Sequence, residues 1–325
     1  MRFLLFLIVH VSLFAVDFDV VVVGTSPFSL FEALYQSHSG KKVLILEQEA
    51  ECGGAWKSIH ICGIPNVDLG CHMIGNNMAL KAFLEEYAGC TFVSHDNPQE
   101  PFSSGKSELG YYFSKGCYEL IDHLLRQIRA TDIVLLTNTP LEIATIDPVQ
   151  KNATVHTKAG DYTTHKLIVT PMSSFVIQPG NAKQSYNKSK YYHLYLLIQD
   201  PTPPRFSYQS KVGNGINRVM NLTPFVGLQD TGRHLIVVQT HKESTLKNSR
   251  EIFDVLKRMK LVDETAYVLK EETYIYESGA FNQALVKKMN LGSYFELLQT
   301  GHFGNLATYI AKWKTALKRY EFLDK

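Results

Sequence analysis

The stretch VVVGTSPFSLFEALYQ, residues 21–36, decides the fold. An unbroken run of valines ends at Gly24, which is typical of a parallel strand buried on both faces. A helix is expected to begin directly afterwards. Ser26 suits the N-cap, and Pro27 suits the first helical position, where its missing N–H is not needed. The stretch therefore predicts a buried strand, a tight turn and a helix.

The next segment completes a βαβ unit. The helix is expected to run from Pro27 to Ser39 and to end at Gly40, which suits a left-handed C-cap. KKVLILE, residues 41–47, reads as a second buried strand. It closes on Glu47, 23 positions after Gly24. An acidic residue there can accept hydrogen bonds from both hydroxyls of an adenosine ribose, so the unit predicts dinucleotide binding.

The turn itself departs from the usual G-x-G-x-x-G pattern. Gly24 is kept for the tight turn, but Ser26 stands where a second glycine lets the backbone approach a pyrophosphate. Ser29 stands where a third glycine allows close helix–strand packing. Backbone N–H groups at the start of the helix would still face a ligand. From these residues alone, a modified cofactor site and a plain βαβ unit both stay open.

Composition bounds the function classes. The chain has 325 residues, enough for one large domain or two interleaved ones. Apolar residues make up 45%, charged residues 20%, and the net charge is +2, so nothing favours a nucleic-acid partner. The five cysteines show no CxxC pair and no zinc spacing, which predicts no metal site and favours buried thiols over a disulfide framework: Cys52, Cys62, Cys71, Cys90 and Cys117.

The N-terminus carries an apolar run, residues 3–16, behind Arg2. Its length suits a signal peptide and is short for a membrane span, although Leu13 makes a poor cleavage site. Two alternatives stay open for residues 1–16. A signal peptide at 1–15 would place the protein in the secretory pathway or periplasm. An uncleaved extension, with weak membrane association, would leave it in the cytoplasm. Three glycosylation-type sites do not decide this, since such matches arise by chance: Asn152, Asn187 and Asn221.

A family resemblance begins behind the second strand, where EQEAECGGAW places Gly53 and Gly54. Strand, terminal Glu47 and then two glycines resemble the FAD-binding N-terminus of the flavin-containing amine oxidase and protoporphyrinogen oxidase superfamily, which includes the UDP-galactopyranose mutases. The family usually continues G-G-R, whereas this chain has no arginine there. Trp56 is expected either to pack on the cofactor or to lie in the core.

Further matches follow in the family's order. NVDLGCHMI, residues 66–74, resembles its D/E-x-G-x-H stretch near the flavin, and residues 111–128 resemble its glycine-led helix. Residues 133–171 resemble its inserted β-meander, whose backbone near Leu141 meets the adenine in the family. Residues 293–317 resemble its C-terminal cofactor segment, which implies cofactor contacts at these positions: Gly301, His302, Asn305 and Leu306.

The resemblance implies an α/β fold in which a Rossmann-like FAD-binding domain carries an inserted β-meander. This domain is expected to be interleaved with a smaller, mostly antiparallel α+β substrate domain. Residues 17–90, 112–175 and 277–325 are assigned to the first, and 91–111 and 176–276 to the second. Short β-rich runs in the second, such as YYHLYLLIQD, suit an antiparallel sheet that roofs the flavin.

Candidate chemical groups are few. His72 is expected either beside the flavin, as a proton-transfer group, or as a structural histidine. Tyr274 and Tyr276 alternate along one strand and so share a face, where they would line a substrate pocket or pack in the core. Arg218 would bind an anionic substrate or lie on the surface.

Function is implied by the resemblance rather than by these groups. It implies an FAD-dependent oxidoreductase that transfers a hydride from a small organic substrate to flavin N5. Two alternatives stay open. One is a non-redox flavin isomerase of the sugar-nucleotide mutase type. The other is a non-catalytic binding protein on the same fold, like the Rab GDP-dissociation inhibitors. The sequence indicates no oligomeric state.

Overall fold

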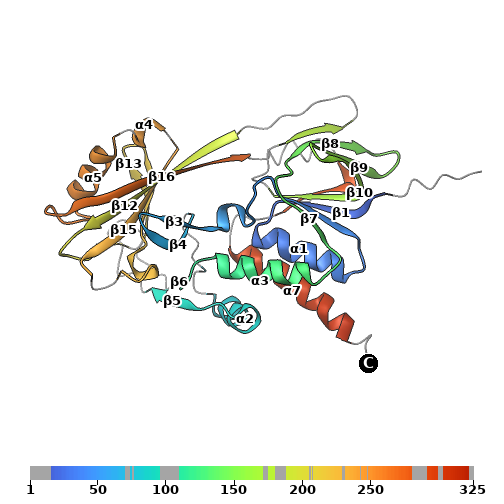
Figure 1. The fold of residues 1–325 in the computed structure, drawn as a ribbon, viewed down its shortest axis with the longest axis horizontal. Helices are drawn as coiled ribbons and strands as arrows, with labels where there is room; N and C mark the ends of the chain where they lie inside the picture. Colours follow the sequence, from blue (N-terminus) through green and yellow to red (C-terminus); the bar gives the residue numbers. More distant parts are fainter. Residues whose placement is uncertain are drawn as a thin grey trace, which may run out of the picture.

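The structure is a computed structural model that describes residues 16–69, 74, 77–95, 110–170, 175–179, 188–204, 206, 208–228, 231–241, 243–246, 248–279, 291–298 and 303–321. Two β-sheets form its two halves (Figure 1). A mixed sheet is built from both ends of the chain, and an antiparallel sheet is built from the middle of the chain.

The mixed sheet has the strand order β11-β8-β9-β10-β1-β2-β7, and β17 pairs with β10 beside this path. Its central strands are parallel, and β9 is antiparallel to both of its neighbours, β8 and β10. The strands are β1 (Phe18–Val23), β2 (Val43–Leu46), β7 (Val134–Leu136), β8 (Leu141–Asp147), β9 (Asn152–Thr157), β10 (Gly160–Val169), β11 (Val176–Pro179) and β17 (Phe295–Leu297).

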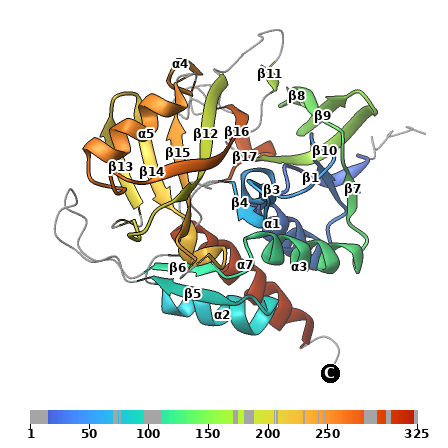
Figure 2. The same ribbon diagram turned by 60° about the vertical axis from the view of Figure 1, so that its left-hand side comes forward.

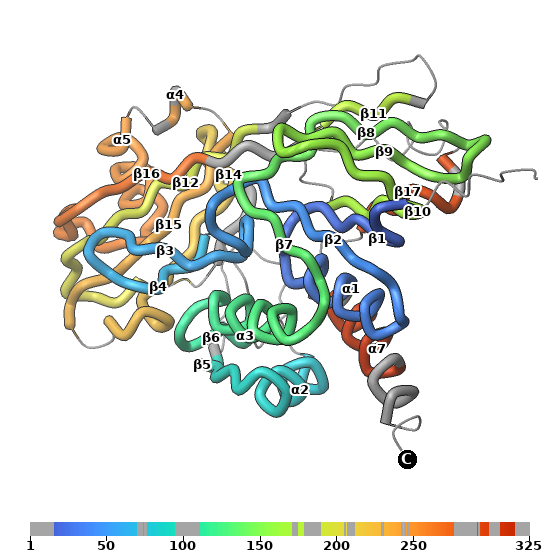
Figure 3. Tube along the Cα trace, turned by 45° about the vertical axis from the view of Figure 1, so that its right-hand side comes forward, coloured from blue at the N-terminus to red at the C-terminus, as the bar shows by residue number. Residues whose placement is uncertain are grey.

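Valines run unbroken through β1 because both faces of the strand are buried. Val20 and Val22 pack into a core with α1 (Pro27–His38), α3 (Tyr118–Arg129) and α7 (Phe303–Glu321). Val21 and Val23 pack into a second core with β8 and β9. Figure 3 shows the three helices on one side of β1 and β2 and the meander strands on the other. The pattern that predicted a doubly covered parallel strand is confirmed.

The meander is joined to the parallel sheet through one long strand. The first part of β10, from Gly160, pairs antiparallel with β9, and its later part pairs parallel with β1. The turn expected at residues 159–160 is present, and Gly160 has φ +136°. Beyond the meander, β11 pairs with β8, so the mixed sheet continues to Pro179. The sequence had placed residues 176–179 in the other domain.

Small elements connect the two halves. The hairpin β3 (Ser58–Ile61)–β4 (Ile64–Asp68) follows a 3₁₀ turn η1 (Gly54–Trp56). The hairpin β5 (Phe92–His95)–β6 (Gly110–Phe113) and α2 (Met78–Ala88) lie together in Figure 2. The β3–β4 hairpin lies close to Gly116, where a Cβ would be 2.9 Å from the Asn66 carbonyl oxygen. Its φ of +87° also favours glycine.

The antiparallel sheet has the order β13-β14-β15-β12-β16. One face is covered by α5 (Ser249–Arg258) and the other packs against β3, β4 and β6, so the expected antiparallel α+β unit is confirmed. Its other elements are β12 (Lys188–Gln199), β13 (Tyr208–Gly213), β14 (Ile216–Asn221), η2 (Thr223–Phe225), β15 (Arg233–Thr240), α4 (Glu243–Leu246) and β16 (Tyr267–Gly279); η3 (Gly292–Tyr294) precedes β17.

Residues 1–15 lie outside the described residues, so both alternatives for the N-terminus stay predictions. In the described ranges no helix is both long and apolar enough to cross a membrane. Asn152 and Asn221 are buried in strands and offer no room for a glycan on the folded chain. Four cysteines are free thiols, as expected, and Cys71 lies outside the described residues: Cys52, Cys62, Cys90 and Cys117.

Candidate dinucleotide-binding site

The turn between β1 and α1 is built around Gly24. Its φ is +94°, and a Cβ there would be 3.0 Å from the Thr170 hydroxyl oxygen, so both conformation and space favour glycine. Its N–H donates to the Leu46 carbonyl at 2.8 Å. Within the part of the chain that the structure describes, the N–H groups of Thr25 and Ser26 have no acceptor. Free N–H groups at a helix start form an anion site.

Ser26 is the N-cap that the sequence predicted. Its hydroxyl oxygen accepts a hydrogen bond from the Ser29 N–H at 3.3 Å and lies 2.9 Å from the Ser29 hydroxyl. Pro27 is buried at the first helical position. The Ser26 hydroxyl is therefore turned toward the first turn of α1 rather than away from it. Ser29 is fully buried, which fits the close packing expected at this position.

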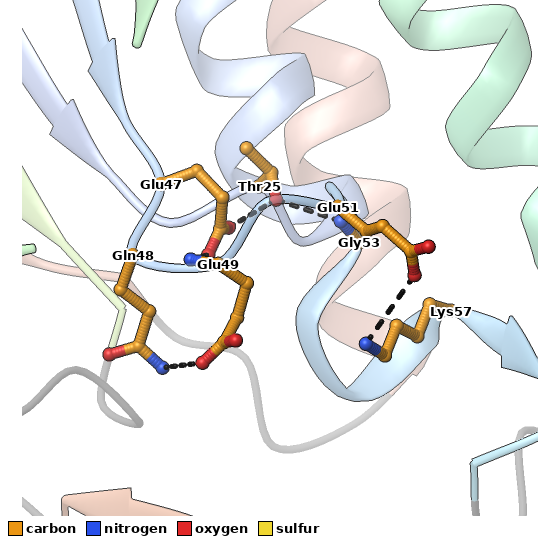
Figure 4. Close-up of polar contacts among 7 residues, drawn as sticks. All are labelled: Thr25, Glu47, Gln48, Glu49, Glu51, Gly53 and Lys57. Atoms are coloured by element: carbon orange, nitrogen blue, oxygen red, sulfur yellow. Dashed lines mark hydrogen bonds and ion pairs between the residues drawn. The ribbon is translucent and has the colours of Figure 1, made fainter. Parts of the chain in front are cut away.

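Glu47 lies directly after β2, next to this turn, and only 3% of it is exposed. One carboxylate oxygen accepts a hydrogen bond from the Thr25 hydroxyl and the other accepts one from the Glu49 N–H at 2.9 Å (Figure 4). Burial raises the pKa of the Glu47 carboxyl above its ordinary 4.5, and these two hydrogen bonds partly oppose the shift. Each oxygen keeps a second acceptor site, which a ribose hydroxyl can use.

Thr25 ties this carboxylate to the glycine pair. Its hydroxyl oxygen accepts a hydrogen bond from the Gly53 N–H at 2.8 Å while the hydroxyl donates to Glu47 (Figure 4). Thr25 is 1% exposed. Thr25 was not predicted as a site residue, because it occupies a variable position of the glycine motif and gives no local signal. Its two hydrogen-bond partners, Glu47 and Gly53, are 22 and 28 positions away from it in the sequence.

The glycine pair forms the sharp turn that leads into η1. Gly53 has φ +112° and Gly54 has φ +55°. Trp56 packs its ring edge-on against Phe28, with the centroids 5.5 Å apart, beside the core on the helix side of the sheet. Trp56 is partly buried at the edge of this core, and its expected contact with a cofactor stays a prediction. Lys57 follows η1, and its ammonium lies 3.7 Å from a carboxylate oxygen of Glu51.

The segment before Leu141 lies against the other side of Glu47. The Thr139 N–H donates to the Glu47 carbonyl at 2.8 Å, and the Asn138 N–H donates to the Glu49 carbonyl at 3.0 Å. Leu141 itself is buried at the start of β8. Its backbone is therefore close to the residue expected to hold the ribose, which is where the resemblance places the adenine contact.

The C-terminal segment is only partly described. Leu306 lies in the first turn of α7, but its side chain is fully buried in the core, so only its backbone is available to a cofactor. Asn305 lies in the same turn, and its side chain is outside the described residues. Gly301, His302 and His72 also lie outside them, so their expected roles stay predictions.

The candidate substrate residues lie on the antiparallel sheet. Strand pairing places Arg218 opposite Gln239, Gln239 opposite His193, and His193 opposite Tyr274. Tyr276 is on the same strand as Tyr274, and its side chain is outside the described residues. Two of the three residues named from the sequence therefore share one row across four strands. His193 and Gln239 were not predicted as site residues, although His193 is the one polar side chain in the apolar run YYHLYLLI of β12.

This arrangement can hold a dinucleotide. Free N–H groups at the start of α1 suit a pyrophosphate, and the buried carboxylate of Glu47 suits the hydroxyls of a ribose. Across the described residues there is no cluster of histidine, cysteine and acidic side chains able to hold a metal ion. The geometry around Gly24 and Glu47 is that expected of a dinucleotide-binding site.

Comparison with known proteins agrees with this geometry. The family model for an NAD(P)-binding Rossmann-like domain matches residues 22–87, which include Gly24, Glu47 and the glycine pair. No curated protein matches the sequence.

Solved structures match over nearly the whole chain. A UDP-galactopyranose mutase in its reduced form has a TM-score of 0.66 at 11% identity, covering 94% of this chain and 96% of its own. A putative protoporphyrinogen oxidase from Exiguobacterium has 0.64 at 10%, covering 94% and 99%. Putrescine oxidase bound to putrescine has 0.60 at 10%, covering 94% and 99%. A Plasmodium falciparum Rab GDI shares the fold as well.

Proposed function

We propose that this chain, whose fold is that of the FAD-dependent amine oxidase-like superfamily, is an FAD-dependent oxidoreductase. The observation that carries the proposal is the meeting of the free N–H groups of the α1 turn with the buried carboxylate of Glu47. The two groups suit the two polar parts of a dinucleotide, the pyrophosphate and the ribose. The reaction proposed is removal of a hydride from a C–H bond of a small organic substrate.

The chain's own residues would bind and orient the cofactor. Backbone groups from Gly24 to Pro27 would face the pyrophosphate, and Glu47 would accept from the adenosine ribose. The turn at Gly53 and Gly54, the backbone near Leu141 and the segment from Gly301 to Leu306, with His302 and Asn305, complete the proposed contacts. Bound FAD would supply the hydride acceptor at its flavin N5. His72 is proposed to move a proton beside the flavin, with Tyr274, Tyr276 and Arg218 contacting substrate.

Two other functions share the fold and define the test. A mutase-type isomerase acts on a nucleotide diphosphate sugar, and such a substrate calls for several converging cations. A binding protein like a Rab GDP-dissociation inhibitor would hold no flavin. The serines at positions 26 and 29 and the missing arginine after Gly54 favour the binding protein, whereas Glu47 and the glycine pair favour a cofactor.

The colour of the purified protein is the deciding observation. The protein is expected to be yellow, to release FAD on denaturation and to lose its flavin absorbance when reduced without oxygen. A yellow protein that returns to its oxidised spectrum on exposure to an electron acceptor supports the oxidoreductase. A yellow protein that converts a nucleotide sugar without net redox change supports the mutase. A colourless protein that takes up no added FAD supports the binding protein.

A further inference from the structure

The face of the antiparallel sheet that looks toward the mixed sheet changes character along its strands. Near β3 and β4 it is apolar, with Tyr195, Val237 and Met220 side by side in one buried cluster. Two residues further along each strand, the next row on the same face is polar: Arg218, Gln239, His193 and Tyr274. Directly opposed residues of antiparallel strands share a face, so these four side chains lie in a line about 14 Å long.

The middle of this row is fixed by hydrogen bonds. Both bonds are between side chains. Gln239 Nε2 donates to His193 Nε2 at 2.9 Å, and Gln239 Oε1 accepts from Asn217 Nδ2 at 3.3 Å. The pairing shifts between Ile216 and Arg218, so Asn217 stands at a β-bulge, a device that re-aims a side chain. His193 is 1% exposed and Gln239 is 9% exposed. Most buried polar groups in folded proteins are hydrogen-bonded, because an unbonded polar group is costly to bury.

The two ends of the row are cationic. Arg218 is exposed, and no carboxylate of the described residues lies within ion-pair distance of it. At the other end, the Lys57 ammonium lies 5.9 Å from the centre of the Tyr274 ring. The Lys57 ammonium also lies 3.7 Å from a carboxylate oxygen of Glu51. The Glu51 side chain is 78% exposed, so this ion pair is weak. An anion lying along the row would meet positive charge at both ends.

The row also adjoins the candidate cofactor site. The Tyr195 hydroxyl, one row away from His193, donates to the Asp68 carbonyl at 3.1 Å, where β4 ends. Lys57 lies four residues after Gly53, whose N–H binds Thr25. The polar row thus begins where the nucleotide-binding half of the chain meets the sheet. Both connections run through backbone segments that the family resemblance places around the cofactor.

We propose that this row is the recognition surface for an organic anion, the substrate of the proposed oxidoreductase. Arg218 binds the carboxylate or comparable anionic group, and Tyr274 packs on the organic part. The buried, hydrogen-bonded pair of Gln239 and His193 lies between them and fixes the strands that carry Arg218 and Tyr274 relative to each other. Calling the anion a substrate rests on the proposed function, but the binding of an anion can be measured without a flavin.

Three probes of one shape test the charge preference: benzoate, benzamide and benzylamine. Each is titrated into the purified protein by calorimetry, which needs no colour, and the flavin absorbance is recorded in parallel. Benzoate is expected to bind most tightly. Arg218→Gln should weaken benzoate by about tenfold or more, as expected when a charge-assisted hydrogen bond is lost. Arg218→Lys should keep part of the affinity. Arg233→Gln, at the far end of β15, is the matched control and should change nothing.

A second variant keeps the test independent of Arg218. Gln239→Glu adds a negative charge to the row and is expected to abolish benzoate binding, while thermal unfolding confirms that the variant is folded. Equal binding of the three probes, tighter binding of benzylamine, or unchanged benzoate affinity in Arg218→Gln overturns the inference. A yellow protein with any of these results keeps the oxidoreductase and loses the anion site. A colourless protein that binds benzoate through Arg218 keeps the site and loses the oxidoreductase.

Discussion

The hydroxyl of Thr25 donates a hydrogen bond to the buried carboxylate of Glu47 and accepts one from the backbone N–H of Gly53. One hydroxyl thereby fixes the first turn, the end of β2 and the glycine pair relative to one another. These are the three segments that surround the proposed ribose and pyrophosphate. The position of the Glu47 carboxylate is therefore set by the side chain at a variable position of the glycine motif.

Thr25→Val removes both hydrogen bonds while keeping the side-chain shape. It leaves a buried carboxylate oxygen without its donor, so the free energy of unfolding should fall by about 1–3 kcal/mol. FAD affinity should fall as well, since Glu47 is no longer held in place. Thr25→Ser keeps the hydroxyl and is the matched control. Denaturant unfolding and FAD titration of both variants check this; equal behaviour of Val and Ser would show that the hydroxyl holds nothing.

Glu47→Ala should weaken FAD binding by about tenfold or more, because charge-assisted hydrogen bonds to the ribose are worth roughly 1.5–3 kcal/mol each. Fluorescence titration at neutral pH measures the change. Glu47→Gln keeps the size of the side chain and one acceptor oxygen, so its loss should be smaller. Unchanged FAD affinity in the alanine variant would show that Glu47 does not hold the ribose.

The pH dependence follows from the raised pKa of Glu47. Because the folded-state pKa lies above 4.5, its contribution to stability is fully present below the unfolded value and is lost as the pH rises through the folded pKa. FAD affinity should move the opposite way: it should fall as the pH drops through the raised pKa and the carboxylate is protonated. Denaturant unfolding and FAD titration of the parent and of Glu47→Gln, carried out from about pH 4 to 8, measure the pH dependence of stability and of FAD affinity separately. A step of equal size in the glutamine variant would assign it to another group.

Ser26→Gly is expected to tighten FAD binding or leave it unchanged. The serine hydroxyl is turned toward Ser29, and glycine at an N-cap costs only a few tenths of a kcal/mol. Removing the side chain should therefore relieve crowding of the pyrophosphate at little cost to the helix. If FAD affinity instead falls about tenfold with the fold intact, the Ser26 hydroxyl is a phosphate ligand, because a fall of that size is expected when one charge-assisted hydrogen bond is lost.

The buried thiols should be slow to react. Burial raises the pKa of Cys62 to about 11 and of Cys90 to about 12, and burial together with the nearby Asp68 raises the pKa of Cys117 well above its ordinary value. A variant with serine at positions 52 and 71 isolates these three. Ellman's reagent at pH 8, roughly the pKa of a free thiol, should modify none of them rapidly until denaturant is added. Rapid modification of a thiol in the folded variant would contradict their burial.

Much of the fold was predictable because its signals are local. The valine run, Gly24 and the Ser26–Pro27 helix start lie within a few residues, and the structure has each of them as expected. Thr25 was not predictable, because its partners are distant in sequence and its own position is variable. The row through His193 and Gln239 depends on strand register, which a single strand does not specify. The pairing of β11 with β8 is non-local for the same reason.

The central claim, that the α1 turn and Glu47 bind the adenosine half of FAD, is tested most directly by titrating flavin-free protein with FAD and with FMN. The two ligands share the flavin and differ in the adenosine monophosphate. FAD should bind at least about tenfold more tightly than FMN, the margin expected from the hydrogen bonds to Glu47 alone. Equal affinity for the two, or binding of neither, would contradict the account.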